Sequence, residues 1–322
     1  MVGSPAVTRI VRFAAPPRRL VRAGLPVLSL ALVLLGIAWL NPRAISYLGL
    51  NLMLNLALPI VLATIAQMFV IAVNDLDLSI GFFVSFVGCV SVTLLPKEPL
   101  LGSAVLLAAL LAYAAVGALV QLRNLPSIVV TLGMSFVWQG LALVILPRPG
   151  GTAPVWLGTL LNYQVPVVPF PIVAAVAVGL VVHVGLMRTS YGVILRGAGG
   201  NPAAIDRAGW SLLGVKVFAF TLAGLFGTLS GLALIGLSGA ADPNIGNGYT
   251  LLSIAGVILG GGEFVGGRIS PVGAVIGALT LTLASSSLLS FLHIPPDWQV
   301  GANGAILIIV LAARALVTRG DR

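Results

Sequence analysis

The chain has 322 residues, of which 59% are hydrophobic and only 8% are charged, and its formal net charge is +9. Soluble domains carry about 25% charged residues, so this composition excludes a soluble protein and predicts one that lies in a bilayer. The positive charge is therefore compared first with the positive-inside rule for membrane proteins, and no nucleic-acid partner is expected.

The fold class predicted is an all-α, polytopic transmembrane helical bundle. No sustained alternation of apolar and polar residues supports a lipid-facing β-barrel, and the single Cys89 excludes an internal disulfide. About 20 apolar residues cross the hydrocarbon core, and on that basis there are about ten candidate spans. They cover residues 24–40, 49–73, 80–95, 100–121, 127–146, 167–187, 215–237, 248–261, 271–292 and 299–317. The eighth is short and rich in glycine, so it is either a complete span, a half-span or a re-entrant segment.

The distribution of basic residues predicts which side of the membrane each end of a span faces. Residues 1–23 form a basic tail without an acid and without the cleavage site of a signal peptide. If this tail is cytoplasmic, 14 of the 17 basic residues lie inside, and only Arg43, Lys97 and Arg148 lie outside. Both termini are therefore expected in the cytoplasm, with a transmembrane domain over 24–318.

The longest internal segment that cannot lie in lipid covers residues 188–216, on the cytoplasmic side. Asn201 is a good N-cap, Pro202 suits the first helical position, and Gly209 suits a left-handed end, so the spacing predicts a helix of about two turns. A helix this short is marginal alone and needs a partner. We expect it to dock on a soluble cytoplasmic protein through Asn201, Pro202, Ala203, Ala204, Asp206, Arg207 and Gly209.

A polar turn separates the second and third candidate spans. It contains Asp75, Asp77 and Ser79, and either Asp77 or Ser79 is positioned to cap the third span. Acids near a span are costly and often functional. The alternative is a tight cytoplasmic turn whose acids are solvated, and both interpretations are consistent with the sequence.

A second cytoplasmic turn follows the eighth span and is rich in glycine, with Gly261 and Gly262 at its start. It lacks the Gly-Lys-Ser/Thr ending and the preceding strand of a phosphate loop, so no nucleotide site is expected there. Glu263 and Arg268 are expected to pair, at little gain in stability.

The fifth span has a small and polar stripe that contains Thr131, Ser135 and Gln139. Such a stripe either lines a transport pathway or allows close helix packing, and packing is favoured for most of its members. No paired acids, metal-ligand cluster or nucleophile with a base occurs in the sequence, so no catalytic residue, metal or bound cofactor is expected.

Four motifs in order carry a resemblance to a known family. They are Asn74–Gly81, Pro126–Gly133, Gly199–Ala204 and Leu259–Ile269. The chain resembles the membrane permease subunit of ribose-, xylose- and galactose-type ABC sugar importers, in the superfamily that also contains branched-chain amino acid permeases. Asn74-Asp75-Leu76 replaces the usual Gly-Gly-Ile, and Glu263 stands where a small residue is common.

The resemblance implies a transport subunit, not an enzyme, in a bacterial inner membrane. It implies a second permease copy or paralogue, cytoplasmic ATPase subunits that use the ATP and dock on 201–209, and an external substrate-binding protein that delivers a monosaccharide.

Other substrates and mechanisms remain open at this stage. Within the superfamily the alternatives are a nucleoside, an autoinducer-type furanose or a branched-chain amino acid. An ion-coupled secondary transporter is a further alternative, but only Asp75 and Asp77 are available to bind its ion, and both are expected at the wrong depth.

Overall fold

The computed structural model describes residues 18–288 and six further residues, which are Phe291, Trp298, Gly301, Gly304, Ala305 and Ile308. The basic tail before Arg18 and the tenth candidate span, 299–317, lie outside the described residues apart from those isolated positions. The described helices are α1 (Arg18–Leu40), η1 (Pro42–Ile45), α2 (Tyr47–Leu54), α3 (Ala57–Ala72), α4 (Ile80–Thr93), α5 (Pro99–Leu122), α6 (Ser127–Ile145), α7 (Val155–Leu161), α8 (Phe170–Leu180), η2 (Val181–Met187), α9 (Ser190–Gly200), α10 (Pro202–Arg207), α11 (Leu212–Ser238), α12 (Tyr249–Leu259), α13 (Pro271–Thr282) and η3 (Leu283–Leu288).

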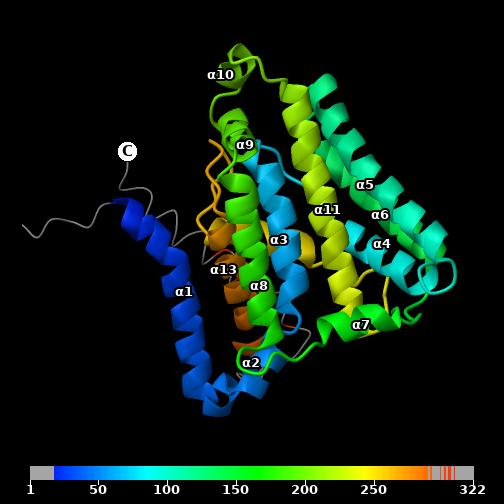
Figure 1. Cartoon of the computed structure of the whole chain (residues 1–322), viewed down its shortest axis with the longest axis vertical. Coiled ribbons are helices and arrows are strands. Elements are labelled where there is room, and N and C mark those ends of the chain that lie inside the picture. Colours follow the sequence, from blue (N-terminus) through cyan, green and yellow to red (C-terminus); the bar gives the residue numbers. More distant parts are fainter. Residues whose placement is uncertain are drawn as a thin grey trace, which may run out of the picture.

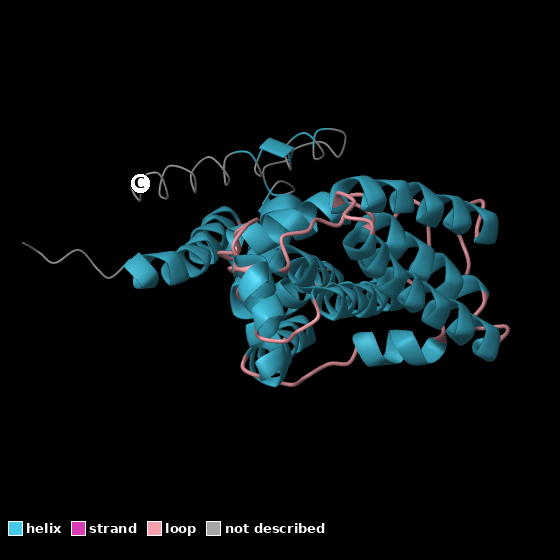
Figure 2. Ribbon diagram, turned by 90° about the horizontal axis from the view of Figure 1, so that it is seen from above, coloured by secondary structure: helices cyan, strands magenta, loops and turns pink. Residues whose placement is uncertain are grey.

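The predicted all-α class is confirmed for the part of the chain that the structure describes, which contains no strand and a single isolated bridge between Gly150 and Ala241. Seen from above, helices joined by loops make up the bundle, and α1 lies at its edge (Figure 2). Four helices are long and apolar enough to cross a membrane, and a fifth span results if α2 and α3, bent by 47°, are counted together.

The third and eighth candidate spans are short helices. Helix α4 has 14 residues and α12 has 11, which give lengths of about 21 Å and about 16 Å at 1.5 Å per residue. Neither matches a hydrocarbon core of about 30 Å. The expectation of a full span over 80–95 is therefore wrong, while the suspicion about 248–261 is supported.

The core of the bundle is α3, whose 16 residues are all buried. A helix that is apolar on every side is stable only when other elements surround it, and α3 packs against α11, α12, α13, α8 and α9. By contrast, only 28%, 22% and 28% of the best windows in α5, α6 and the α8–η2 span are buried. Their exposed apolar faces are suited to lipid.

Among the described residues, basic side chains from the two predicted sets lie at opposite ends of the bundle. Helix α10 projects at the top of Figure 1, and α2 and α7 lie at the opposite end. Lys216 and Arg268 belong to segments at the α10 end, whereas Arg43 and Arg148 belong to segments at the α2 and α7 end. The sorting of charge by end agrees with the predicted topology; which end faces the cytoplasm remains a prediction.

Candidate functional site

Helix α10 is the most projecting element of the bundle (Figure 1), and it is built as its local sequence predicts. Asn201 Oδ1 accepts a hydrogen bond from the Ala204 N–H at 3.1 Å, and Pro202 occupies the first helical position. Gly209 follows with φ of 83°, in the left-handed region. None of the six residues Pro202–Arg207 is buried. The capping prediction is confirmed, and the helix presents its surface to whatever lies beyond this end.

One apolar contact fastens α10 to the bundle. Ile205 is the half-buried residue of α10, and its side chain packs over Gly197 of α9. Arg207 Nε donates to its own helix at Ala203 O (3.1 Å), and Asp206 is exposed. The polar face of α10 is therefore turned outward, and its apolar residue holds it on α9.

Three of the four sequence motifs converge directly beneath α10. Asn74, which ends the turn after α3, donates from Nδ2 to Gly199 O at 2.6 Å and accepts at Oδ1 from Gly266 N at 3.0 Å. Its φ of 61° is left-handed, a conformation that glycine and asparagine adopt most readily. This conformation explains how asparagine is accommodated at a position where the resemblance leads us to expect glycine. The Asn74 side chain also makes two hydrogen bonds that glycine cannot make.

The glycine-rich loop packs against α9 with almost no space between the backbones. A Cβ on Gly199 would meet Ala72 O and the backbone of Gly267, and a Cβ on Gly267 would meet Arg196 O. Gly261 also has a positive φ, of 93°, and the Gly262 N–H bonds to Val257 O at 2.9 Å. The loop therefore serves as a packing surface, in agreement with the absence of a phosphate-loop pattern.

The predicted pairing of Glu263 and Arg268 is confirmed. Arg268 Nη1 lies 3.2 Å from Glu263 Oε2, and the side chain of Arg268 is 64% exposed. At such exposure an ion pair contributes about 0–1 kcal/mol to the free energy of unfolding. This pair therefore joins the two ends of the loop but adds little to its stability.

Asp77 and Ser79 are buried, so the interpretation of this turn as one with solvated acids is wrong for Asp77. Asp77 Oδ1 accepts from Ser79 N and Ser79 Oγ, both at 2.7 Å, and Oδ2 accepts from the Tyr113 hydroxyl at 2.8 Å. Ser79 occupies the N-cap position of α4, but its hydroxyl is turned to Asp77 and not to the helix. The two residues form a closed polar cluster inside the bundle.

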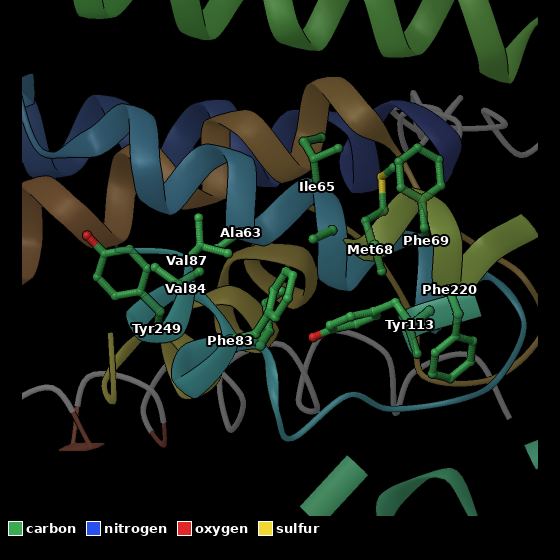
Figure 3. Close-up of a cluster of buried hydrophobic side chains, with 14 of the residues drawn as sticks. Ala63, Ile65, Met68, Phe69, Phe83, Val84, Val87, Tyr113, Phe220 and Tyr249 are labelled. Atoms are coloured by element: carbon green, nitrogen blue, oxygen red, sulfur yellow. The ribbon is translucent and has the colours of Figure 1, made fainter. Parts of the chain in front are cut away.

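The backbone of Asp77 is held as tightly as its side chain. In the amide orientation that satisfies both of its groups, buried Gln67 of α3 donates to Asp77 O at 3.0 Å and accepts from Asp77 N at 3.2 Å. Tyr113 lies with its hydroxyl toward Phe83 of α4 (Figure 3), and the two ring centroids are 4.5 Å apart. Helices α3, α4 and α5 therefore meet at this carboxylate.

The expected depth of Asp77 is also wrong. Tyr113 lies in the middle third of α5, and the segment between α3 and α4 descends from the upper end of α3 to α4 beside the lower half of α11 (Figure 1). Asp77 therefore lies well inside the bundle. Its carboxylate already has three donors from its own chain, so it is engaged in fixing this segment.

Helix α6 supplies side chains that hold the same segment. Ser127 Oγ accepts from Leu76 N at 3.1 Å, and Thr131 Oγ1 accepts from Leu78 N at 3.0 Å. Thr131 and Ser135 are buried, and Ser135 Oγ donates to Leu132 O of its own helix at 2.6 Å. Both residues therefore take part in helix packing.

Gln139 is the most accessible member of the predicted stripe. It is half-buried, and its Nε2 donates to Asn244 Oδ1 at 3.1 Å. Asn244 belongs to the connection between α11 and α12, so Gln139 joins α6 to that connection.

Two features of the interior were missed by sequence reasoning. The first turns of α4 and α12 meet, since Gly81 N donates to Thr250 Oγ1 (3.1 Å) and Gly246 N donates to Ser85 Oγ (2.9 Å). Helices α12 and α13 also pack through a Gly-xxx-Gly pair on each helix. The second feature has a known sequence signal for close helix contact; the first has none.

The chain is similar to known proteins over most of its length. A family described as "Branched-chain amino acid transport system / permease component" matches residues 48–311. The ribose import permease protein RbsC of Haemophilus influenzae is 28% identical over 91% of this chain and 93% of the relative. The L-arabinose ABC transporter permease protein AraH of Azospirillum brasilense is 30% identical over 85% of this chain and 80% of its own length. The probable ABC transporter permease protein YphD of Escherichia coli is 31% identical over 89% of each chain. No solved structure matches the chain.

Proposed function

The chain belongs to the family of branched-chain amino acid transport system permease components, and on this basis we propose that it is the membrane permease of an ATP-binding-cassette importer for a monosaccharide. Relatives whose names give ribose and arabinose as substrates match most of the chain. A neutral solute also suits the interior, because Asp77 is the one Asp, Glu, Lys, Arg or His residue that is buried among the described residues. A charged substrate would favour charged groups along its path.

The observation that carries the proposal is α10, a projecting helix that is capped at both ends, exposes nearly all of its residues and rests on α9. A preordered surface of this kind reduces the entropy lost on binding. We assign it to the cytoplasmic ATPase subunits, which bind and hydrolyse the ATP. The permease itself supplies no catalytic residue.

The remaining assembly follows from the same proposal. The bundle has about ten membrane segments, of which α4 and α12 are shorter than a full span, and both termini lie in the cytoplasm of a bacterial inner membrane. A second permease copy or a paralogue completes the pathway, and an external binding protein delivers the sugar. The ATPases transmit their closure to α10 as a rigid lever, and the spans before and after it rock from outward to inward access. This transmission requires that the ATPases make different contacts with α10 in the outward-facing and inward-facing states.

The lever is tested by the double variant Arg207→Glu/Gly209→Pro in the complete complex, reconstituted in proteoliposomes with its ATPase and binding protein. Proline cannot adopt the left-handed φ of residue 209, and the charge reversal alters the exposed face. We expect sugar uptake and sugar-stimulated ATP hydrolysis to fall by about tenfold or more, within the range of measured coupling between sites. Arg207→Lys/Gly209→Asn, which keeps the charge and tolerates the conformation, is the matched control and is expected to retain both activities.

Unchanged uptake and ATP hydrolysis in the double variant would contradict the lever. Uptake that persists without the ATPase and collapses with an ion gradient would instead favour an ion-coupled transporter. Binding measurements on the partner binding protein identify the substrate and distinguish a sugar from a nucleoside, a furanose signal or an amino acid.

A further inference from the structure

An ion pair joins two segments that the sequence keeps far apart. Asp75 lies in the turn after α3, and Lys216 lies in the second turn of α11. Asp75 Oδ2 is 2.9 Å from Lys216 Nζ, and the two side chains are 9% and 22% exposed. Attraction between charges this close is stronger where water is largely excluded.

The ion pair lies next to the base of α10. Both residues line a cavity of about 280 Å³, together with Gln121 of α5, Ala198 of α9 and Pro202, the first residue of α10. Asn74 also lines this cavity, and its side chain bonds to Gly199 and Gly266. The pair therefore occupies the space between the projecting helix and the interior of the bundle.

On one side of the pair, the chain leads directly to α10. Gly209 and Trp210 follow the helix, and Ser211 caps α11 by accepting from Gly214 N at 3.2 Å. Lys216 lies two residues after Gly214 in α11. A displacement of α10 therefore reaches Lys216 through a short connection into a continuous helix.

On the other side of the pair, the chain leads to the buried carboxylate. Asp75 is followed by the non-helical residues 76–79, whose backbone bonds to Ser127 and Thr131 of α6 and to Gln67 of α3. Asp77 then connects the segment to Tyr113 of α5. Among the contacts described for this end, Asp75–Lys216 is the charged connection between α11 and this segment.

We propose that the Asp75–Lys216 ion pair is a charged link, additional to the Asn74–Gly199 hydrogen bond, through which a displacement of α10 reaches the segment 74–79. These two side chains are then positioning residues of the transport cycle. The inference rests on the proposed function, since it requires that a partner moves α10. An ion pair suits this role because its attraction depends mainly on distance, so it persists while two elements rotate relative to each other. A directed hydrogen bond weakens steeply when its angle changes.

The test uses the reconstituted complex with Asp75→Asn, Lys216→Met and the exchange Asp75→Lys/Lys216→Asp. Uptake, basal ATP hydrolysis and sugar-stimulated ATP hydrolysis are measured, together with the amount of ATPase that copurifies. We expect each single variant to assemble normally and keep basal hydrolysis, but to lower the ratio of stimulated to basal hydrolysis by about tenfold. The exchange is expected to restore most of that ratio, because it restores the attraction. Lys97→Met and Glu98→Gln, which remove the same kinds of charge from the exposed turn between α4 and α5, are matched controls expected to behave as wild type.

A wild-type ratio in both single variants would overturn the link, and so would an assembled exchange variant that is no better than the single variants. Loss of copurifying ATPase or of basal hydrolysis in the single variants would also overturn it, because the pair would then hold the fold together and not transmit motion. A wild-type complex that takes up no sugar with ATP would overturn the proposed function itself, so the two failures are distinguishable.

Discussion

Gly273→Val is expected to prevent normal packing of α12 against α13 and to abolish uptake. A Cβ at residue 273 would meet Gly260 O, and it would lie 2.9 Å from Gly260 C. The contact is reciprocal, since a Cβ on Gly260 would meet Gly273 O, and a Cβ on Gly277 would lie 2.8 Å from Gly260 N. Small residues at this spacing let two helix backbones approach closely in a membrane.

The size of the effect follows from what obstructs the new side chain. Overpacking a core costs about 1–3 kcal/mol where side chains can move aside. At residue 273 the obstructing atoms belong to the backbone of the facing helix, so we expect a destabilisation of about 3 kcal/mol or more. The measurement is the fraction of monodisperse permease that survives heating in detergent, since membrane proteins of this size often unfold irreversibly.

Gly140→Val is the matched control for this prediction. Gly140 lies in the long helix α6, and a Cβ there would have no atom within 4 Å. The valine is expected to leave thermal survival and uptake close to wild type, because it enters open space on the apolar surface. Equal thermal survival of the two variants would show that α12 and α13 do not pack as closely as the structure has them.

Asp77→Ala is expected to produce the largest effect of any single change at a polar residue. The alanine removes the acceptor of three hydrogen bonds and leaves Ser79 N, Ser79 Oγ and the Tyr113 hydroxyl without that partner in the interior. Ser79 Oγ and the Tyr113 hydroxyl, which are 3.2 Å apart, can still bond to each other. About two donors are therefore left unsatisfied, at about 1–3 kcal/mol each, so a total loss of about 2 kcal/mol or more is expected. Thermal survival and uptake are measured as before.

Tyr113→Phe is the informative comparison for Asp77→Ala. It removes one donor and leaves Asp77 with its two bonds from Ser79, so a cost of about 1 kcal/mol is expected. The double variant Asp77→Ala/Tyr113→Phe is expected to cost less than the sum of the single variants, because the tyrosine hydroxyl is no longer left without its acceptor. Strict additivity would mean that Asp77 and Tyr113 do not interact in the folded protein.

Local chemistry made much of this fold predictable from the sequence. The apolar composition led to an all-α bundle, and the ends of α5, α6 and α11 lie within a few residues of the predicted spans. Helix α10 was predicted with its cap and its left-handed end, because Asn201, Pro202 and Gly209 act on backbone groups only a few residues away. Such signals do not depend on the rest of the chain.

The tertiary structure alone decided what the polar motifs do. The sequence placed Asp75, Asp77 and Ser79 in one turn but did not distinguish solvated acids from buried ones, because burial depends on α5 and α6, which follow later in the chain. Asp77 meets Tyr113 from α5, and Asn74 meets Gly266 from the turn after α12. These partners are 36 and 192 residues away. Hydrogen bonds over such separations form only when the packing of several helices brings the groups together, and no local pattern encodes that packing.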